Sequence, residues 1–178
     1  MTVSHVQAAL LIAATACFAL APLRASAESN TASATLKLVD GADAGTVKFM
    51  ETSAGVLLKV ELKGLKPGPH GFHVHSVGKC EGDFSSAGEI FNPLGAGHGF
   101  MNEEGPMAGD LPNVHAAADG TATAEMLSPF IHLRTDAEDA LIDSDGAAIV
   151  VFANPDDYRT DPEGGAEPRV ACGILKKD

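Results

Sequence analysis

Apolar and polar residues alternate along much of the chain, and this alternation limits the possible folds more than any other feature. In segment 56–63, aliphatic residues occupy positions 56, 58, 60 and 62, and charged residues occupy positions 59, 61 and 63. Successive side chains of a β-strand point to opposite faces, so this pattern is typical of a strand with one buried face. Shorter alternations occur at 36–38 and 47–49.

Clusters of turn residues separate the alternating segments. They read DGADAG at 40–45, KPGPHG at 66–71, ADG at 118–120 and DSDG at 143–146. We expect further strands at 121–126, 147–152 and 169–175, and we find no long helical periodicity outside the apolar N-terminal run. Short strands with frequent turns predict an all-β domain, either a sandwich or a barrel.

Two long stretches, 77–113 and 153–168, do not fit the strand pattern. Both are rich in Gly, Pro and charged residues. Loops of this length in a compact domain are usually functional unless they are disordered. The formal net charge of −12 argues against nucleic acid or an anionic membrane as a partner.

The N-terminus has features of an export signal. Residues 8–22 form an apolar run that is short for a membrane span, and Ala25-Ser26-Ala27 fits the small-x-small cleavage pattern. We expect residues 1–27 to be a signal peptide and residues 28–178 to form one domain. The mature protein is then periplasmic or secreted, with no membrane attachment after cleavage.

The signal is imperfect, because the segment before the apolar run lacks Lys and Arg. An alternative makes Cys17 a lipoprotein acylation site, which requires a bulky residue where Ala14 stands. If Cys17 leaves with the signal, Cys80 and Cys172 remain. Two distant cysteines in an exported chain favour a disulfide, and two buried free thiols are the alternative.

The stretch GPHGFHVH at 68–75 places His73 and His75 two positions apart. On a strand, both imidazoles point to the same side, and two close imidazoles suit copper or zinc. The pair alone is a weak signal, since many such pairs are solvated. Here it follows a turn and precedes a long loop, which favours a metal site.

This motif and those after it resemble the copper/zinc superoxide dismutases, especially the exported bacterial branch. The further motifs are Cys80, AGEIFNPLGAGHG, AGDLPNV, ADGTAT and RVACGIL, and together they span about 35–175. The resemblance implies an antiparallel Greek-key β-barrel or sandwich of about eight strands. It also implies a disulfide between Cys80 and Cys172, and two functional loops that match the two irregular stretches.

The resemblance assigns site residues position by position. His73 and His75 match copper ligands, His98 and Asp110 match zinc ligands, and Arg169 matches the arginine that guides superoxide to copper. Three family ligand histidines are replaced. These are the copper–zinc bridge, a second zinc histidine and the last copper histidine, and their positions hold Ile90, Met107 and Phe152. Hydrophobic replacements suggest that the site is repacked as core.

The missing ligands weaken the case for catalysis. Dismutation requires a metal that stays bound while it changes oxidation state. With only two imidazoles, water would fill most of the remaining coordination positions of Cu(II). Two imidazoles suit Cu(I), which accepts two nearly linear ligands. In the family the bridging histidine is also thought to relay protons, and Ile90 has none to donate.

Other groups are candidates to compensate, and each matched residue also has a purely structural interpretation. A rebuilt copper site would draw on one of Met107, His70, His115 and His132, and a weak zinc site would add His115 or Glu104. Alternatively, Asp110 accepts backbone hydrogen bonds, His98 is a solvated loop residue, and Arg169 pairs with a carboxylate such as Asp157.

Three functions follow as hypotheses. The favoured one is an exported dismutase-like protein with little or no dismutase activity and a role in copper handling or binding. The second is an active superoxide dismutase that converts superoxide to oxygen and hydrogen peroxide. The third is a metal-free interaction module, since fold does not fix function. The partner is accordingly superoxide or a copper ion, and the sequence leaves the oligomeric state open.

Overall fold

The computed structural model describes residues 30–134 and 140–178, together with Met1. The predicted signal peptide, including Cys17, lies outside the described residues apart from Met1. Within the described part of the chain, no helix is long and apolar enough to cross a membrane.

The regular structure of the described residues is almost entirely β. The strands are β1 (Thr31–Leu38), β2 (Asp43–Thr52), β3 (Gly55–Leu62), β4 (Gly68–His70), β5 (Phe72–His75), β6 (Val114–Ala116), β7 (Ala122–Ser128), β8 (Ala148–Phe152), β9 (Arg169–Ile174) and β10 (Lys176–Lys177), with one 3₁₀ helix at Ser85–Ala87.

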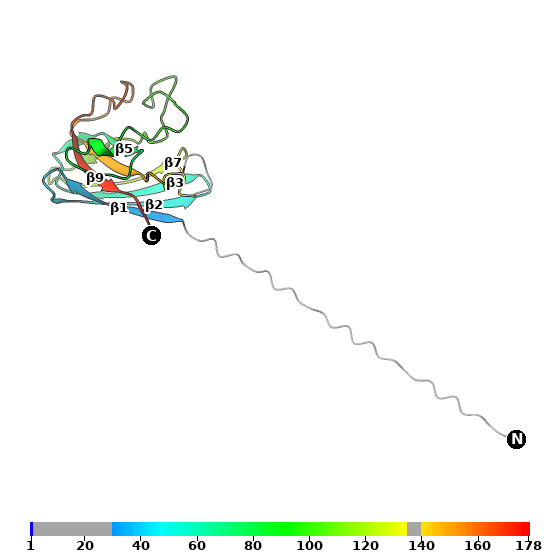
Figure 1. Ribbon diagram of the computed structural model, residues 1–178. Helices are drawn as coiled ribbons and strands as arrows, with labels where there is room; N and C mark the ends of the chain where they lie inside the picture. The colour runs from blue at the N-terminus through cyan, green and yellow to red at the C-terminus, as the bar shows by residue number, and fades with distance from the viewer. Residues whose placement is uncertain (2–29, 135–139) are drawn as a thin grey trace.

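The strands form one large antiparallel sheet and one small one. The large sheet has the order β5-β8-β9-β1-β2-β3-β7, with β10 also paired to β1, and β4 pairs with β6 in the small sheet. Strands from the two ends of the chain therefore meet at the β9–β1 pair. This curled, antiparallel arrangement confirms the predicted all-β sandwich or barrel (Figure 1).

The predicted alternation appears in the burial of the strands. In β3 the side chains of Val56, Leu58, Val60 and Leu62 are buried, and those at 59 and 61 are exposed. The strands predicted at 121–126, 147–152 and 169–175 correspond to β7, β8 and β9.

The first strand begins earlier than the apolar pattern indicates. Residues 31–33 look like part of a polar stretch, but they pair with β2 from Thr31 opposite Met50 onward. Ala32 and Ala34 face the core and are 0% and 1% exposed, so small side chains continue the buried face where larger apolar ones are missing.

The two long stretches, 77–113 and 153–168, contain no strand longer than an isolated bridge. Figure 1 shows them together on the same side of the sheet, in green and in orange to brown. A disulfide joins Cys80 in the first loop to Cys172 in β9, across 92 positions of sequence. The first loop is thus covalently tied to the strand next to β8.

Local packing brings the histidine motif into the interior. Gly71 separates β4 from β5, and a Cβ atom there would lie 2.8 Å from Cβ of Ala166 in the second loop. Strand β5 then pairs with β8, with His73 opposite Val150 and His75 opposite Ala148. Both faces of β5 are buried, so both imidazoles are shielded from solvent.

Candidate metal centre

Each imidazole of the β5 pair makes one hydrogen bond. Nε2 of His73 lies 2.9 Å from Oδ2 of Asp156, and Nδ1 of His75 lies 3.0 Å from the carbonyl oxygen of Gly88. Since a carboxylate and a carbonyl only accept, these two nitrogens are the donors. The hydrogen bonds therefore orient the rings and fix which nitrogen carries the proton.

The other nitrogen of each ring differs from the first in its surroundings. Nδ1 of His73 and Nε2 of His75 are buried and lack a hydrogen bond within the described residues. Burial, followed by the charge of Arg169, lowers the pKa of His75 to about 3. His75 is thus neutral, and its Nε2 carries a lone pair. A buried polar atom without a partner is costly, so a native structure usually retains it for a reason such as an ion.

Phe152 lies beside both imidazoles. Its ring centroid is 5.2 Å from that of His73 and 5.9 Å from that of His75, while the imidazole centroids are 6.4 Å apart. Phe152 is fully buried in a small apolar cluster that includes Phe84 and Cys172. A phenyl ring supplies no ligand atom.

The remaining replaced positions differ from each other in burial. Ile90 forms an isolated β-bridge with His75 and is 4% exposed. Met107 is only half-buried. Ile90 and Phe152 are thus buried residues, as the hypothesis of a repacked site expects, whereas Met107 is not.

His98 links two carboxylates, one from each long loop. Its Nδ1 is 2.8 Å from Oδ1 of Asp110, and its Nε2 is 3.0 Å from Oδ1 of Asp156. Burial acts to lower the pKa of His98, but the hydrogen bonds and charges of both carboxylates raise it to about 10. The ring is an imidazolium that donates from both nitrogens, and the alternative that His98 is a solvated loop residue is wrong, because the side chain is fully buried.

Both carboxylates also accept hydrogen bonds from backbone N–H groups. Oδ2 of Asp110 accepts from the N–H groups of Gly99 and Met107 at 2.7 and 2.9 Å, as the structural alternative for this residue predicts. Burial acts to raise the pKa of Asp156, but hydrogen bonds from His73 and His98 hold it well below its usual range. Asp156 is therefore ionised.

The cation of Arg169 is hydrogen-bonded and paired. Its guanidinium donates to the carbonyls of Phe84 and Gly88 at 2.8 and 2.9 Å and forms an ion pair with Glu163. It also lies 5.8 Å from the centre of the Phe152 ring, within the range of a cation–π contact. The predicted partner from the acidic loop is thus Glu163 and not Asp157, which accepts hydrogen bonds from Thr160 instead.

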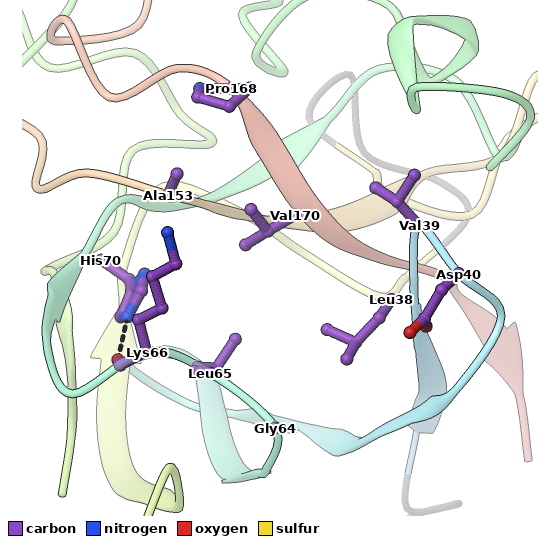
Figure 2. Close-up of a pocket in the computed structure, with 10 residues that line it drawn as sticks. All are labelled: Leu38, Val39, Asp40, Gly64, Leu65, Lys66, His70, Ala153, Pro168 and Val170. Atoms are coloured by element: carbon purple, nitrogen blue, oxygen red, sulfur yellow. Dashed lines mark hydrogen bonds between the residues drawn. The ribbon is translucent and has the colours of Figure 1, made fainter. Parts of the chain in front are cut away.

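The other candidate ligands lie outside this cluster. His70 bonds the carbonyl oxygens of Lys66 and Phe152, and it lines a mainly apolar cleft of about 480 Å³ (Figure 2). His115 is exposed on β6, and Glu104 is exposed in the first loop. His132 contacts Glu51 at 2.9 Å. The expectation that one of them completes a rebuilt site finds no support in these positions.

Residues 43–175 match the family described as copper/zinc superoxide dismutase (SODC). The chain belongs to the copper/zinc superoxide dismutase family. It is 51% identical over 149 residues to "Superoxide dismutase [Cu-Zn]" of Caulobacter vibrioides, a match that covers 82% of this chain and 86% of that protein. It is 37% identical over 139 residues to "Superoxide dismutase-like protein YojM" of Bacillus subtilis, covering 76% of this chain and 71% of that protein.

Solved structures agree with this membership. The crystal structure of a double mutant of a superoxide-dismutase-like protein from Bacillus subtilis, in which two residues were changed to histidine, superimposes with a TM-score of 0.78. It is 36% identical and matches 80% of this chain and 95% of that chain.

Copper and zinc, which the family implies, fit the residues of this dismutase-family chain unequally. The unpartnered nitrogens of His73 and His75 fit copper, because imidazole is a suitable copper ligand and hydrogen bonds already orient both rings. His73, His98 and Asp110 each offer one atom within 4.8 Å of the others, which is close enough for a metal ion. Zinc there would have to displace the hydrogen bond between His98 and Asp110, so the zinc position fits poorly.

Asp156 and Glu163 also belong to the site, although no sequence motif marks them. Both lie in the acidic loop 153–168, where several Asp and Glu residues look equivalent in sequence. Their burial, at 3% and 8% exposure, distinguishes them from the exposed carboxylates around them. Only the folded loop shows this.

Proposed function

We propose that this dismutase-family protein binds one Cu(I) ion through Nδ1 of His73 and Nε2 of His75 and has little or no dismutase activity. Its role would be copper binding or handling outside the cytoplasm. The observation that carries the proposal is the pair of buried lone pairs without a hydrogen-bond partner among the described residues.

The chemistry of the donors favours the monovalent ion. Cu(I) accepts two nearly linear ligands, whereas Cu(II) prefers four donors in a tetragonal arrangement. Phe152 and Ile90 fill the positions that match two of the family's copper ligands, and both side chains are buried. With only two imidazoles, binding should favour the reduced ion and oppose the return to Cu(II).

The surrounding residues also support low turnover. Bound copper would supply the electron exchange with superoxide. Ile90 cannot move a proton at the position where the family has its bridging histidine. The ion pair with Glu163 offsets the charge of Arg169 that would attract the superoxide anion. We expect dismutase activity at least about a hundredfold below that of a relative with all its ligands, since loss of outer-shell partners alone costs 10–100-fold.

A competition titration tests the copper site. Mature protein is titrated with Cu(I) against a chromogenic Cu(I) chelator under anaerobic conditions, alongside His73→Ala and His75→Ala. His115→Ala is the matched control, because His115 is exposed and lies outside the cluster. The proposal requires one Cu(I) per chain in wild type and control and a loss of at least about tenfold in affinity in each site variant. Identical curves for all four proteins would eliminate it.

An activity assay decides between this function and an active dismutase, which similarity to the superoxide dismutase of Caulobacter vibrioides favours. Copper- and zinc-loaded protein is compared with a relative that has all its ligands. Equal activity would establish the enzyme and refute the proposed impairment. Failure to bind Cu(I), together with no activity, would leave the metal-free interaction module.

We also propose export to the periplasm or the exterior, with cleavage after Ala27. The disulfide between Cys80 and Cys172 is compatible with an oxidising compartment. N-terminal sequencing of protein from cell fractions tests the proposal. A mature chain that begins at Glu28 supports it, an acylated Cys17 supports the lipoprotein alternative, and an intact N-terminus in the cytoplasm contradicts both.

A further inference from the structure

The zinc position of this chain contains a hydrogen-bond network that joins the two long loops. Asp110 lies in the first loop and Asp156 in the second, and the imidazole of His98 bonds both. All three side chains are fully or almost fully buried. The two loops are therefore connected through charged groups in the interior, where such bonds are strong.

The network continues into the backbone on both sides. Asp156 accepts from the backbone N–H of Tyr158 at 2.6 Å, and its own N–H donates to the side chain of Asn113 at 2.9 Å. The amide of Asn113 donates in turn to the carbonyl of Asp156 at 2.9 Å. On the other side, the backbone N–H of His98 donates to Asp161 of the second loop at 2.9 Å.

The same network reaches the sheet through His73, whose Nε2 bonds Asp156. A structural metal ion stabilises a fold by tying together the segments that ligate it. Here hydrogen bonds join the two loops and β5 in the same way. Both ring nitrogens of His98 already make hydrogen bonds, so neither is free to ligate zinc. Neither Ile90 nor Met107 offers an imidazole.

We propose that the network of His98, Asp110 and Asp156 orders both long loops in place of a zinc ion, so that the folded protein neither needs nor retains zinc. This inference does not require copper to bind, although Asp156 also bonds His73 of the proposed Cu(I) site. It concerns the order of the loops and not the activity of a loaded protein.

Amide hydrogen exchange tests it directly. Wild-type protein is treated with a strong zinc chelator, and exchange in loops 77–113 and 153–168 is compared with and without added Zn²⁺. We expect equal exchange, an unchanged melting temperature and substoichiometric zinc by elemental analysis. Retention of about one zinc per chain, or slower loop exchange with zinc, would overturn the proposal.

Substitutions test the network itself. Asp156→Asn keeps the shape of the side chain but removes the charge, and His98→Gln removes one bridge. In zinc-free protein, we expect each to accelerate exchange in both loops at least about tenfold, while the strands stay protected. Glu103→Gln is the control, because it removes one exposed charge in the first loop and should change nothing.

Two further variants test the proposal even if His98→Gln does not fold. If Asp156→Asn, the nearly isosteric change, leaves loop exchange unaltered, the network does not order the loops and the proposal fails. The double variant Ile90→His, Met107→His provides the positive control for zinc. If it gains a zinc-dependent increase in melting temperature that wild type lacks, the assay detects zinc binding and the wild-type result stands.

Discussion

Replacing Phe152 with histidine tests whether copper ligands were exchanged for core packing. The Phe152 ring is fully buried and packs beside His73, His75 and the guanidinium of Arg169. An imidazole would fill much of the same space, so the cavity term is small. The variant would lose part of the stabilisation of about 1.5–3 kcal/mol that burial of the phenyl ring provides. It would also lose up to about 1 kcal/mol from the cation–π contact. It would also leave a nitrogen unpaired, at about 1–3 kcal/mol.

These contributions sum to a loss of about 3 kcal/mol in the metal-free protein. For a domain of this size, that loss lowers the melting temperature by roughly 6–12 °C. Copper should offset it in the variant, because a third imidazole joins His73 and His75. At a free copper concentration a hundredfold above Kd, binding contributes about 2.7 kcal/mol and restores most of the stability.

The assay is a thermal melt with and without Cu(II), accompanied by electron paramagnetic resonance to count bound nitrogens. Phe49→His is the matched control, because Phe49 is also fully buried but lies on β2 and belongs to a different apolar cluster. It should lose comparable stability without rescue by copper. If Phe152→His melts at the wild-type temperature without metal, or if copper stabilises wild type equally, the argument from packing is wrong.

Three further predictions concern the loops. Replacing Cys80 and Cys172 with serine should lower the free energy of unfolding by about 2–5 kcal/mol, measured in urea, and an unchanged value would show that the disulfide is dispensable. His98 has a pKa of about 10 against an ordinary value of 6.5, so its stabilising effect should be complete below pH 6.5 and be lost as the pH rises toward 10. Melts across that range should show a decline that His98→Gln lacks. Gly99→Ala should cost more than about 1 kcal/mol by chemical denaturation, since φ is +98° and the new Cβ would meet the carbonyl oxygen of Tyr158 at 2.1 Å; a neutral effect would contradict this geometry.

Much of the architecture was predictable because the signals are local. The alternation around Leu58 predicts a strand with one buried face, and the turn clusters predict where strands end. The early start of β1 was not predictable in this way, because Thr31 and Ser33 look like linker residues. Only pairing with β2 reveals that Ala32 is a core position.

The candidate site was predictable only in part. Its histidines can be located by motif, and so can the three positions where the family has other ligands. Spacing along a strand, or the position next to a recognisable family motif, identifies them. The partners Asp156 and Glu163 could not be chosen among neighbouring acidic residues. Their roles depend on which carboxylates the folded loop turns inward, and for Asp156 that choice involves His73, which lies 83 positions away in the sequence.

The sequence by itself determined the all-β class, the family and the presence of Ile90, Met107 and Phe152 where the family resemblance expects ligand histidines, because these depend on residue type and order. The tertiary structure decided that His98 is held between two carboxylates, that Glu163 pairs with Arg169, and that two imidazole nitrogens have no hydrogen-bond partner among the described residues. Burial and charge pairing are properties of segments brought together from distant parts of the chain, and no local pattern encodes them.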